Sequence, residues 1–166
     1  MERRPSGKLP TLLDADPGVV SVIGYENINI VVWRAQPTPE AVELVQRVAQ
    51  RRRRQHPNGI SAVHLVKGEI TLPDAPTREA FVRLMKGADG SVHCVAVVVA
   101  GSGFWASSAR SLITGMRVLA RGGFDMGLHG DVDEVVKWLP AKHEARTGVH
   151  IDPGQLAAVL RSAEDA

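Results

Sequence analysis

The chain has 166 residues, of which 44% are hydrophobic and 23% charged, and its formal net charge is +2. These proportions are typical of one globular domain and exclude a disordered chain, a collagen-like repeat and a small disulfide scaffold. The longest apolar run, Val95–Ala100, is far shorter than the roughly 20 residues of a membrane-spanning helix. The basic first residues lead into no apolar segment, so we expect neither a signal peptide nor a transmembrane segment.

Residues 1–17 hold three prolines and show no hydrophobic period, so they are predicted to form an N-terminal arm that is either mobile or docked on the domain. The main domain is expected over residues 18–140. Its first two β-rich runs, 19–23 and 28–33, flank a short turn and predict an antiparallel hairpin.

Three amphipathic helices and three strands follow the hairpin in alternation. The helices are expected from 39 to a stop signal at 56–59, over 77–88 and over 104–121, and the strands over 60–66, 92–100 and 126–129. A helix between two successive strands requires a crossover connection, so these strands should lie parallel. Thr38 is expected to cap the first of these helices, which has Pro39 in its first turn.

The last part of the chain is expected to hold two helices. One begins at the capping residue Asp131 and ends at Pro140, because a proline interrupts the hydrogen bonds of a helix. Residues 141–166 are predicted to form a polar linker and a short helix, which is capped by Asp152 and ends near Ser162. The whole pattern predicts an α/β domain in which helices cover a mostly parallel sheet of about five strands.

Several segments follow the order of a known family. Ile30–Trp33 runs into a long amphipathic helix, two strand–helix units follow, and Asp131–Leu139 is a closing acidic and apolar segment. In these features the stretch Ile28–Pro140 resembles the STAS-like family, which includes antagonists of bacterial anti-sigma factors and cytoplasmic domains of sulfate transporters. The closing segment looks like that of a subgroup related to lipid-binding sheets. The resemblance implies a STAS-like fold and a non-catalytic regulatory or protein-interaction module.

The regulatory members of this family carry a phosphorylatable serine in an Asp-Ser-Ser-Gly motif. The corresponding unit here, Lys67–Asp74, contains no serine, and Thr71 and Thr77 are the only hydroxyl groups nearby. The resemblance therefore does not imply a kinase-controlled switch at this position.

A glycine-rich turn with two aromatic residues follows the most apolar strand. Its residues, which begin a G-x-G-x-x-A pattern at the start of a helix, are Gly101, Ser102, Gly103, Phe104 and Trp105. Backbone N–H groups in such a turn can bind phosphate, but the pattern lies in a late strand–helix unit and the aromatic side chains would crowd the approach. We expect a tight turn with Ser102 or a neighbour as helix cap, and a phosphate site or a partner-docking edge as alternatives.

The helix after this turn has a polar outer face. This face includes Ser107, Ser108, Arg110, Ser111 and Arg117. Together with the turn, it is the predicted contact surface for a protein partner, since aromatic residues at a rigid corner are typical interface anchors. Phosphorylation of a serine near the helix start is an alternative role for this face.

Four consecutive arginines, Arg51, Arg52, Arg53 and Arg54, account for the basic character of the chain, because the remaining residues carry a small net negative charge. They come at the end of a predicted helix, where cations complement the helix macrodipole. We therefore expect a solvated helix end. A phosphate-binding patch for nucleic acid or anionic lipid is the alternative, although no aromatic residue or second basic stretch accompanies the run.

The six histidines and the single cysteine do not form a metal-binding pattern. No two histidines have the spacing of metal ligands, and Cys94 has no second cysteine. His64 and His93 fall on predicted strands, where a histidine is usually a core or edge residue. We therefore expect neither a metal nor another cofactor, and the unpaired Cys94 favours a reducing compartment such as the cytoplasm.

These observations leave three functions open. The first is a regulatory or protein-interaction module of STAS-like type, with another protein or a second copy of the chain as partner. The second is a domain that binds a small acidic or amphiphilic molecule at the carboxyl edge of the parallel strands. The third is an enzyme of unknown reaction, which would require Ser102, His129 and Asp131 to converge. We expect no catalytic residues, because an ordinary strand end with Asp131 as helix cap accounts for this pattern.

Overall fold

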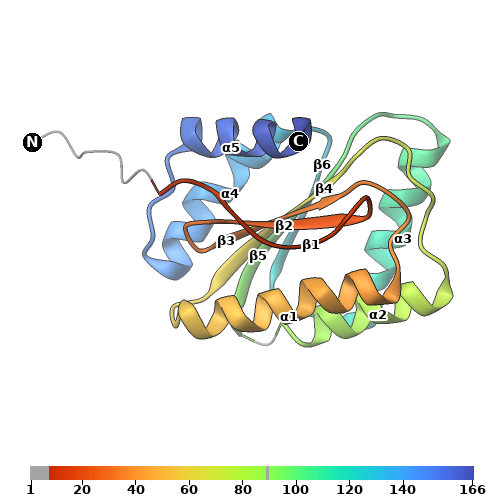
Figure 1. The fold of residues 1–166 in the computed structure, drawn as a ribbon, viewed down its shortest axis with the longest axis horizontal. Helices are drawn as coiled ribbons and strands as arrows, with labels where there is room; N and C mark the ends of the chain where they lie inside the picture. The colour runs from red at the N-terminus through yellow and green to blue at the C-terminus, as the bar shows by residue number, and fades with distance from the viewer. Residues whose placement is uncertain (1–7, 89) are drawn as a thin grey trace, which may run out of the picture.

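The computed structural model describes residues 8–88 and 90–166. Over these residues the chain forms one six-stranded mixed sheet with five helices packed on it (Figure 1). The strands are β1 (Thr11–Asp16), β2 (Val20–Tyr25), β3 (Ile28–Trp33), β4 (Ile60–Val66), β5 (Val92–Val99) and β6 (Asp125–His129). The helices are α1 (Pro39–Gln55), α2 (Ala75–Lys86), α3 (Phe104–Ala120), α4 (Val132–Thr147) and α5 (Pro153–Asp165). The predicted α/β class is confirmed.

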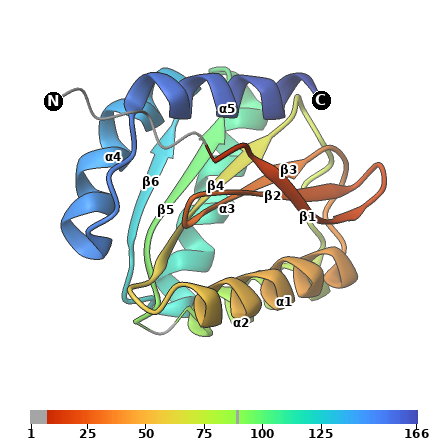
Figure 2. The same ribbon diagram turned by 60° about the vertical axis from the view of Figure 1, so that its left-hand side comes forward.

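The strands lie side by side in the order of the sequence. β1, β2 and β3 form an antiparallel meander, and β3, β4, β5 and β6 are parallel. The three crossovers run in the same direction along the sheet, so a constant crossover hand puts α1, α2 and α3 on one face. α4 and α5 cover the other face, as Figure 2 shows.

The first strand lies within the residues that the sequence assigns to an N-terminal arm. Thr11–Asp16 pairs along its length with β2, and a register shift falls between Leu12 and Asp14. Such a bulge places an extra residue in the strand and breaks the alternation of apolar side chains, which is why the sequence shows no period here. Residues 11–16 of the predicted arm are therefore docked as a strand of the sheet, and residues 1–7 lie outside the described range.

The helix that begins after Asp131 does not end at Pro140 but continues past it to Gly148, where φ is +75°. Its buried side chains keep the helical period on both sides of the proline, with Leu139 before it and His143 after it. Packing of this face on the sheet outweighs the roughly 3 kcal/mol that an interior proline costs. Most of the predicted linker is therefore helical.

The sheet face under α4 and α5 is closely packed. Its buried side chains come from the sheet and from both helices. Among those with no exposed surface are Ile30, Val63, Ala96, Val135 and Leu160. Buried side chains therefore fill the centre of this face, and a shallow hollow lies at its edge, between β1, β2 and α5.

A buried polar network ties α4 to this face. The amide group of Asn27 donates to the carbonyl oxygen of Gly59 (3.0 Å), so its Oδ1 is free to accept from Nε2 of His143 (2.6 Å). Nδ1 of His143 then carries no proton and accepts from the hydroxyl of Ser61 (2.7 Å). Burial lowers the pKa of His143 to about 4, which keeps the imidazole neutral in this network.

The neutral His143 predicts a loss of stability in acid. The unfolded chain takes up a proton on this residue near pH 6.5 and the folded chain only near pH 4, so the stability present above pH 6.5 is lost as the pH falls toward 4. Between pH 7 and pH 5 the free energy of unfolding should fall by about 2 kcal/mol more in the wild-type protein than in His143→Gln. Urea denaturation at both pH values measures this difference, and His150→Gln controls for removal of an exposed imidazole. Identical pH dependences of the wild type and His143→Gln would contradict the network.

Candidate functional site

A cavity of about 150 Å³ lies between the sheet and the helices α1, α2 and α3. Side chains of β3 to β6 form one side of it, and inward-facing side chains of the three helices form the other. The lining is almost entirely apolar and includes Val31, Ala62, Leu84, Leu112 and Met126. Native cores contain few voids larger than a water molecule, so a cavity of this size marks a candidate binding site.

The two faces of β4 show how the cavity arises. Ser61, Val63 and Leu65 face α4 and α5 and are at most 1% exposed. Ala62 and His64 face the opposite helices and keep accessible surface, although β4 lies in the middle of the sheet. Small side chains on both sides, Ala62 on the strand and Ala109 on α3, leave the space between them unfilled. The sheet face under α1, α2 and α3 is therefore less densely packed than the other.

His64 is a polar side chain in this apolar lining. The indole N–H of Trp33 donates a hydrogen bond to Nδ1 of His64 (3.1 Å), and the two rings stack at an angle of 15°. An indole N–H only donates, so Nδ1 accepts and the proton of the neutral ring lies on Nε2. Burial lowers the pKa of His64 to about 4 and keeps the ring neutral near pH 7.

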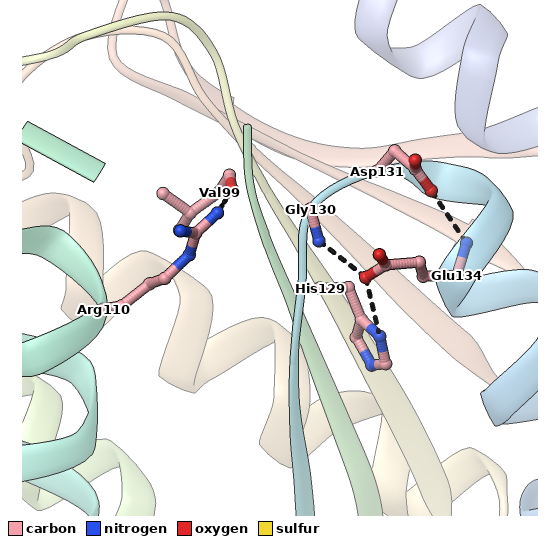
Figure 3. A network of polar contacts seen from close by, with 6 residues as sticks. All are labelled: Val99, Arg110, His129, Gly130, Asp131 and Glu134. Atoms are coloured by element: carbon pink, nitrogen blue, oxygen red, sulfur yellow. Dashed lines mark hydrogen bonds and ion pairs between the residues drawn. The ribbon is translucent and has the colours of Figure 1, made fainter. Parts of the chain in front are cut away.

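The predicted corner after β5 contributes to the cavity wall. Arg110 donates to the carbonyl oxygen of Val99 (2.8 Å; Figure 3). It also donates to the carbonyl oxygen of Gly101 (2.9 Å), and the two hydrogen bonds fix the turn between β5 and α3. The indole N–H of Trp105 donates to the carbonyl oxygen of Ile70 (2.8 Å) and so ties the loop before α2 to the start of α3. Trp105 and Ile70 both line the cavity. The corner therefore connects the interior site with the surface.

The exposed part of the predicted contact surface is centred on Phe104, whose exposed fraction is 89%. Ser102, Gly103, Ser107, Ser111 and Arg117 are also exposed, and Ser108 and Arg110 are half-buried. Farther along α3, Val118 and Leu119 are 69% and 68% exposed. The solvent side of α3 therefore carries apolar side chains at both of its ends.

The cap of α3 is the neighbour of Ser102 and not Ser102 itself. The N-cap residue is Gly103, and no side chain accepts a hydrogen bond from the first turn. Gly101 has φ +92°, a left-handed conformation that glycine adopts without strain, and the chain reaches the helix only after two further residues. Ser102 therefore precedes the capping position.

The arginine run does not form a uniform surface patch. Arg51 and Arg54 are exposed, Arg53 is half-buried, and Arg52 is only 8% exposed. The guanidinium of Arg52 donates to Oδ1 of Asn29 (2.9 Å) and to the carbonyl oxygen of Glu26. Both sequence interpretations, a solvated helix end and a phosphate-binding patch, are therefore wrong for Arg52, because its cation is used inside the protein.

His129 belongs to the cap of α4. Its Nδ1 lies 3.8 Å from Oε2 of Glu134, and this carboxylate also accepts from the backbone N–H of Gly130 (2.8 Å) (Figure 3). Asp131 accepts from the backbone N–H of Glu134 (2.9 Å) and so caps the helix as predicted. Among the described residues, neither His129 nor Asp131 has a polar contact with Ser102.

No protein-family model matches the chain, and no curated protein matches it. Within residues 8–88 and 90–166, no helix has the length and apolar character needed to cross a membrane. The same residues contain no cluster of three or more side chains that could hold a metal ion. The chemistry of the cavity is therefore the basis for assigning a function.

The buried contacts of Arg52 predict a large cost for its removal. Arg52→Met should lower the free energy of unfolding by about 2–4 kcal/mol, because Asn29 and the Glu26 carbonyl lose their donor in a buried site. Arg54→Met changes an exposed member of the same run and should have an effect below about 0.5 kcal/mol. Urea denaturation measures both variants. Equal and small effects would indicate a solvated run of arginines instead.

Proposed function

We propose that this protein binds a small apolar or amphiphilic molecule in the cavity between its parallel strands and α1, α2 and α3. The observation that carries the proposal is the cavity of about 150 Å³ with an almost wholly apolar lining, beneath a sheet whose other face is closely packed. Apolar cavities of about this size stay dry and take up benzene-sized molecules. The ligand would lie under the helices rather than at the carboxyl edge of the strands.

The energetics of the cavity support this proposal. An enclosed void of this volume costs roughly 3–4 kcal/mol at ~24 cal/mol per Å³, which is an upper bound for this partly open cavity. A molecule that fills the void restores the missing contacts, and a ligand that binds only the folded state stabilises it. Binding should therefore raise the thermal unfolding midpoint.

The arrangement of the chain supports assignment to the STAS-like family. Successive strand–helix units fill the parallel part of the sheet in sequence order, and α4 corresponds to the closing segment of the resemblance. The likeness of that segment to lipid-binding sheets agrees with an apolar ligand. Cys94 is a buried free thiol, which supports a reducing compartment such as the cytoplasm.

A regulatory module that binds another protein is the second candidate function. Phe104 favours it, because a large aromatic side chain that is 89% exposed at a turn fixed by Arg110 is typical of an interface anchor. Trp105 is the next residue and lines the cavity, so the two functions are compatible in one domain.

Filling the cavity should abolish ligand binding. In Ala62→Phe the new ring occupies the space next to β4, and we expect the affinity for fluorobenzene, a neutral benzene-sized probe detected by fluorine NMR, to fall at least about tenfold. The thermal unfolding midpoint should be retained or raised, because the ring replaces a void. Ala158→Phe, on the exposed side of α5, is the matched control and should bind the probe as the wild type does. Undiminished binding by a folded Ala62→Phe variant would contradict the proposed site.

The second candidate function predicts a separable effect of Phe104. Phe104→Ser should remove a protein partner that co-purifies with the tagged wild-type protein from its native cells, because the anchor is lost. Binding of fluorobenzene should not change, since Phe104 does not line the cavity. Quantitative mass spectrometry of both purifications measures the partner, with Arg54→Met as a control for a distant surface change. Retention of the same partner by Phe104→Ser would remove this residue from the interface.

A further inference from the structure

We propose that His64 is the specificity-determining residue of the cavity, and that its Nε2–H group selects an uncharged ligand with an oxygen acceptor, such as a ketone or an ester carbonyl. This inference rests on the proposed function of the cavity. It concerns the chemical class of the ligand, which the apolar lining alone does not define.

The position of the proton is fixed by Trp33. Its indole N–H occupies Nδ1 of His64, so the imidazole presents Nε2–H on the opposite side of the ring. Among the described residues, Nε2 of His64 has no hydrogen-bond partner. Unlike Nε2 of His129, which is unpaired and fully inaccessible, Nε2 of His64 is not an inaccessible unpaired atom. Because β4 lies in the middle of the sheet under α1, α2 and α3, the accessible edge of His64 faces the cavity.

Asn29 and Trp105, two other polar residues of the lining, favour an acceptor ligand over a donor, whereas the hydroxyl of Thr71 can both donate and accept. Oδ1 of Asn29 accepts from Arg52, which leaves only the amide group of Asn29, again a donor, for a ligand. The indole N–H of Trp105 is already used by the carbonyl oxygen of Ile70. An unpaired buried donor is costly, so a ligand oxygen that accepts from His64 gains more than a hydrocarbon of the same shape.

The lack of charge in the lining excludes an ionised ligand on physical grounds. None of the described residues that line the cavity is Asp, Glu, Lys or Arg. A carboxylate would lose its hydration without gaining a cation, whereas a carbonyl oxygen needs only one donor. Burial also keeps His64 neutral, with a pKa of about 4, so the ring itself offers no positive charge near pH 7.

Three probes of similar shape test this inference: indane, 1-indanone and indane-1-carboxylate. Each displaces fluorobenzene from the wild-type protein in a competition titration followed by fluorine NMR. We expect 1-indanone to bind about fivefold to tenfold more tightly than indane, and the carboxylate to bind most weakly. His64→Leu should bind indane and 1-indanone with similar affinity, and His64→Gln, which keeps a donor, should recover part of the preference for the ketone. His93→Leu makes the same change on β5 outside the cavity lining and should keep the wild-type ratio.

The outcomes separate this inference from the proposed function. Failure of indane and of fluorobenzene to bind the wild type would overturn the ligand-binding function itself. Equal affinity of the wild type for indane and 1-indanone would leave the cavity in place and overturn the role of His64. Tightest binding of the carboxylate would overturn the uncharged class. If His64→Leu does not fold, nitrogen NMR of the wild-type imidazole tests the role of His64. Of the three probes, only 1-indanone should shift the Nε2–H resonance.

Discussion

The unequal packing of the two faces of the parallel sheet is the constraint on which the remaining features depend. α4 and α5 fill one face with side chains that have no exposed surface, such as Ile30 and Leu160. α1, α2 and α3 span the other face, where small residues such as Ala62 leave a cavity of about 150 Å³. Since β4 and β5 contribute to both faces, the closely packed face holds the strands in place while the other remains incompletely filled.

The two faces of β4 also differ in how completely their polar side chains are hydrogen-bonded. Ser61 donates a hydrogen bond to His143, which in turn donates to Asn27, so these side chains find their hydrogen-bond partners within the protein. His64 receives only one hydrogen bond, from Trp33, and its second nitrogen is left for a ligand. One strand therefore supplies a structural contact on one face and a recognition group on the other. A saturated network fixes a single arrangement, whereas an unpaired donor is satisfied only when a molecule of suitable chemistry binds.

Much of the fold could be predicted from the sequence, and the site could not. The parallel strands follow from alternating patterns, and the caps Thr38, Asp131 and Asp152 are confirmed. β1 was missed because its bulge hides the period, and the passage of α4 through Pro140 depends on tertiary packing. The cavity was missed because a void is set by the distance between layers. The only feature of the sequence that pointed to the cavity was His64, which lies on the same face of an apolar strand as the small residue Ala62.

Crystallography under xenon pressure tests the central claim most directly, because xenon enters dry apolar cavities without needing any polar group. A xenon atom between β4 and α3, in contact with Ala62 and close to His64, is the result expected from an unfilled face under α1, α2 and α3. An electron-density map without xenon there, in which side chains of α2 and α3 fill the space against the sheet, would contradict the account.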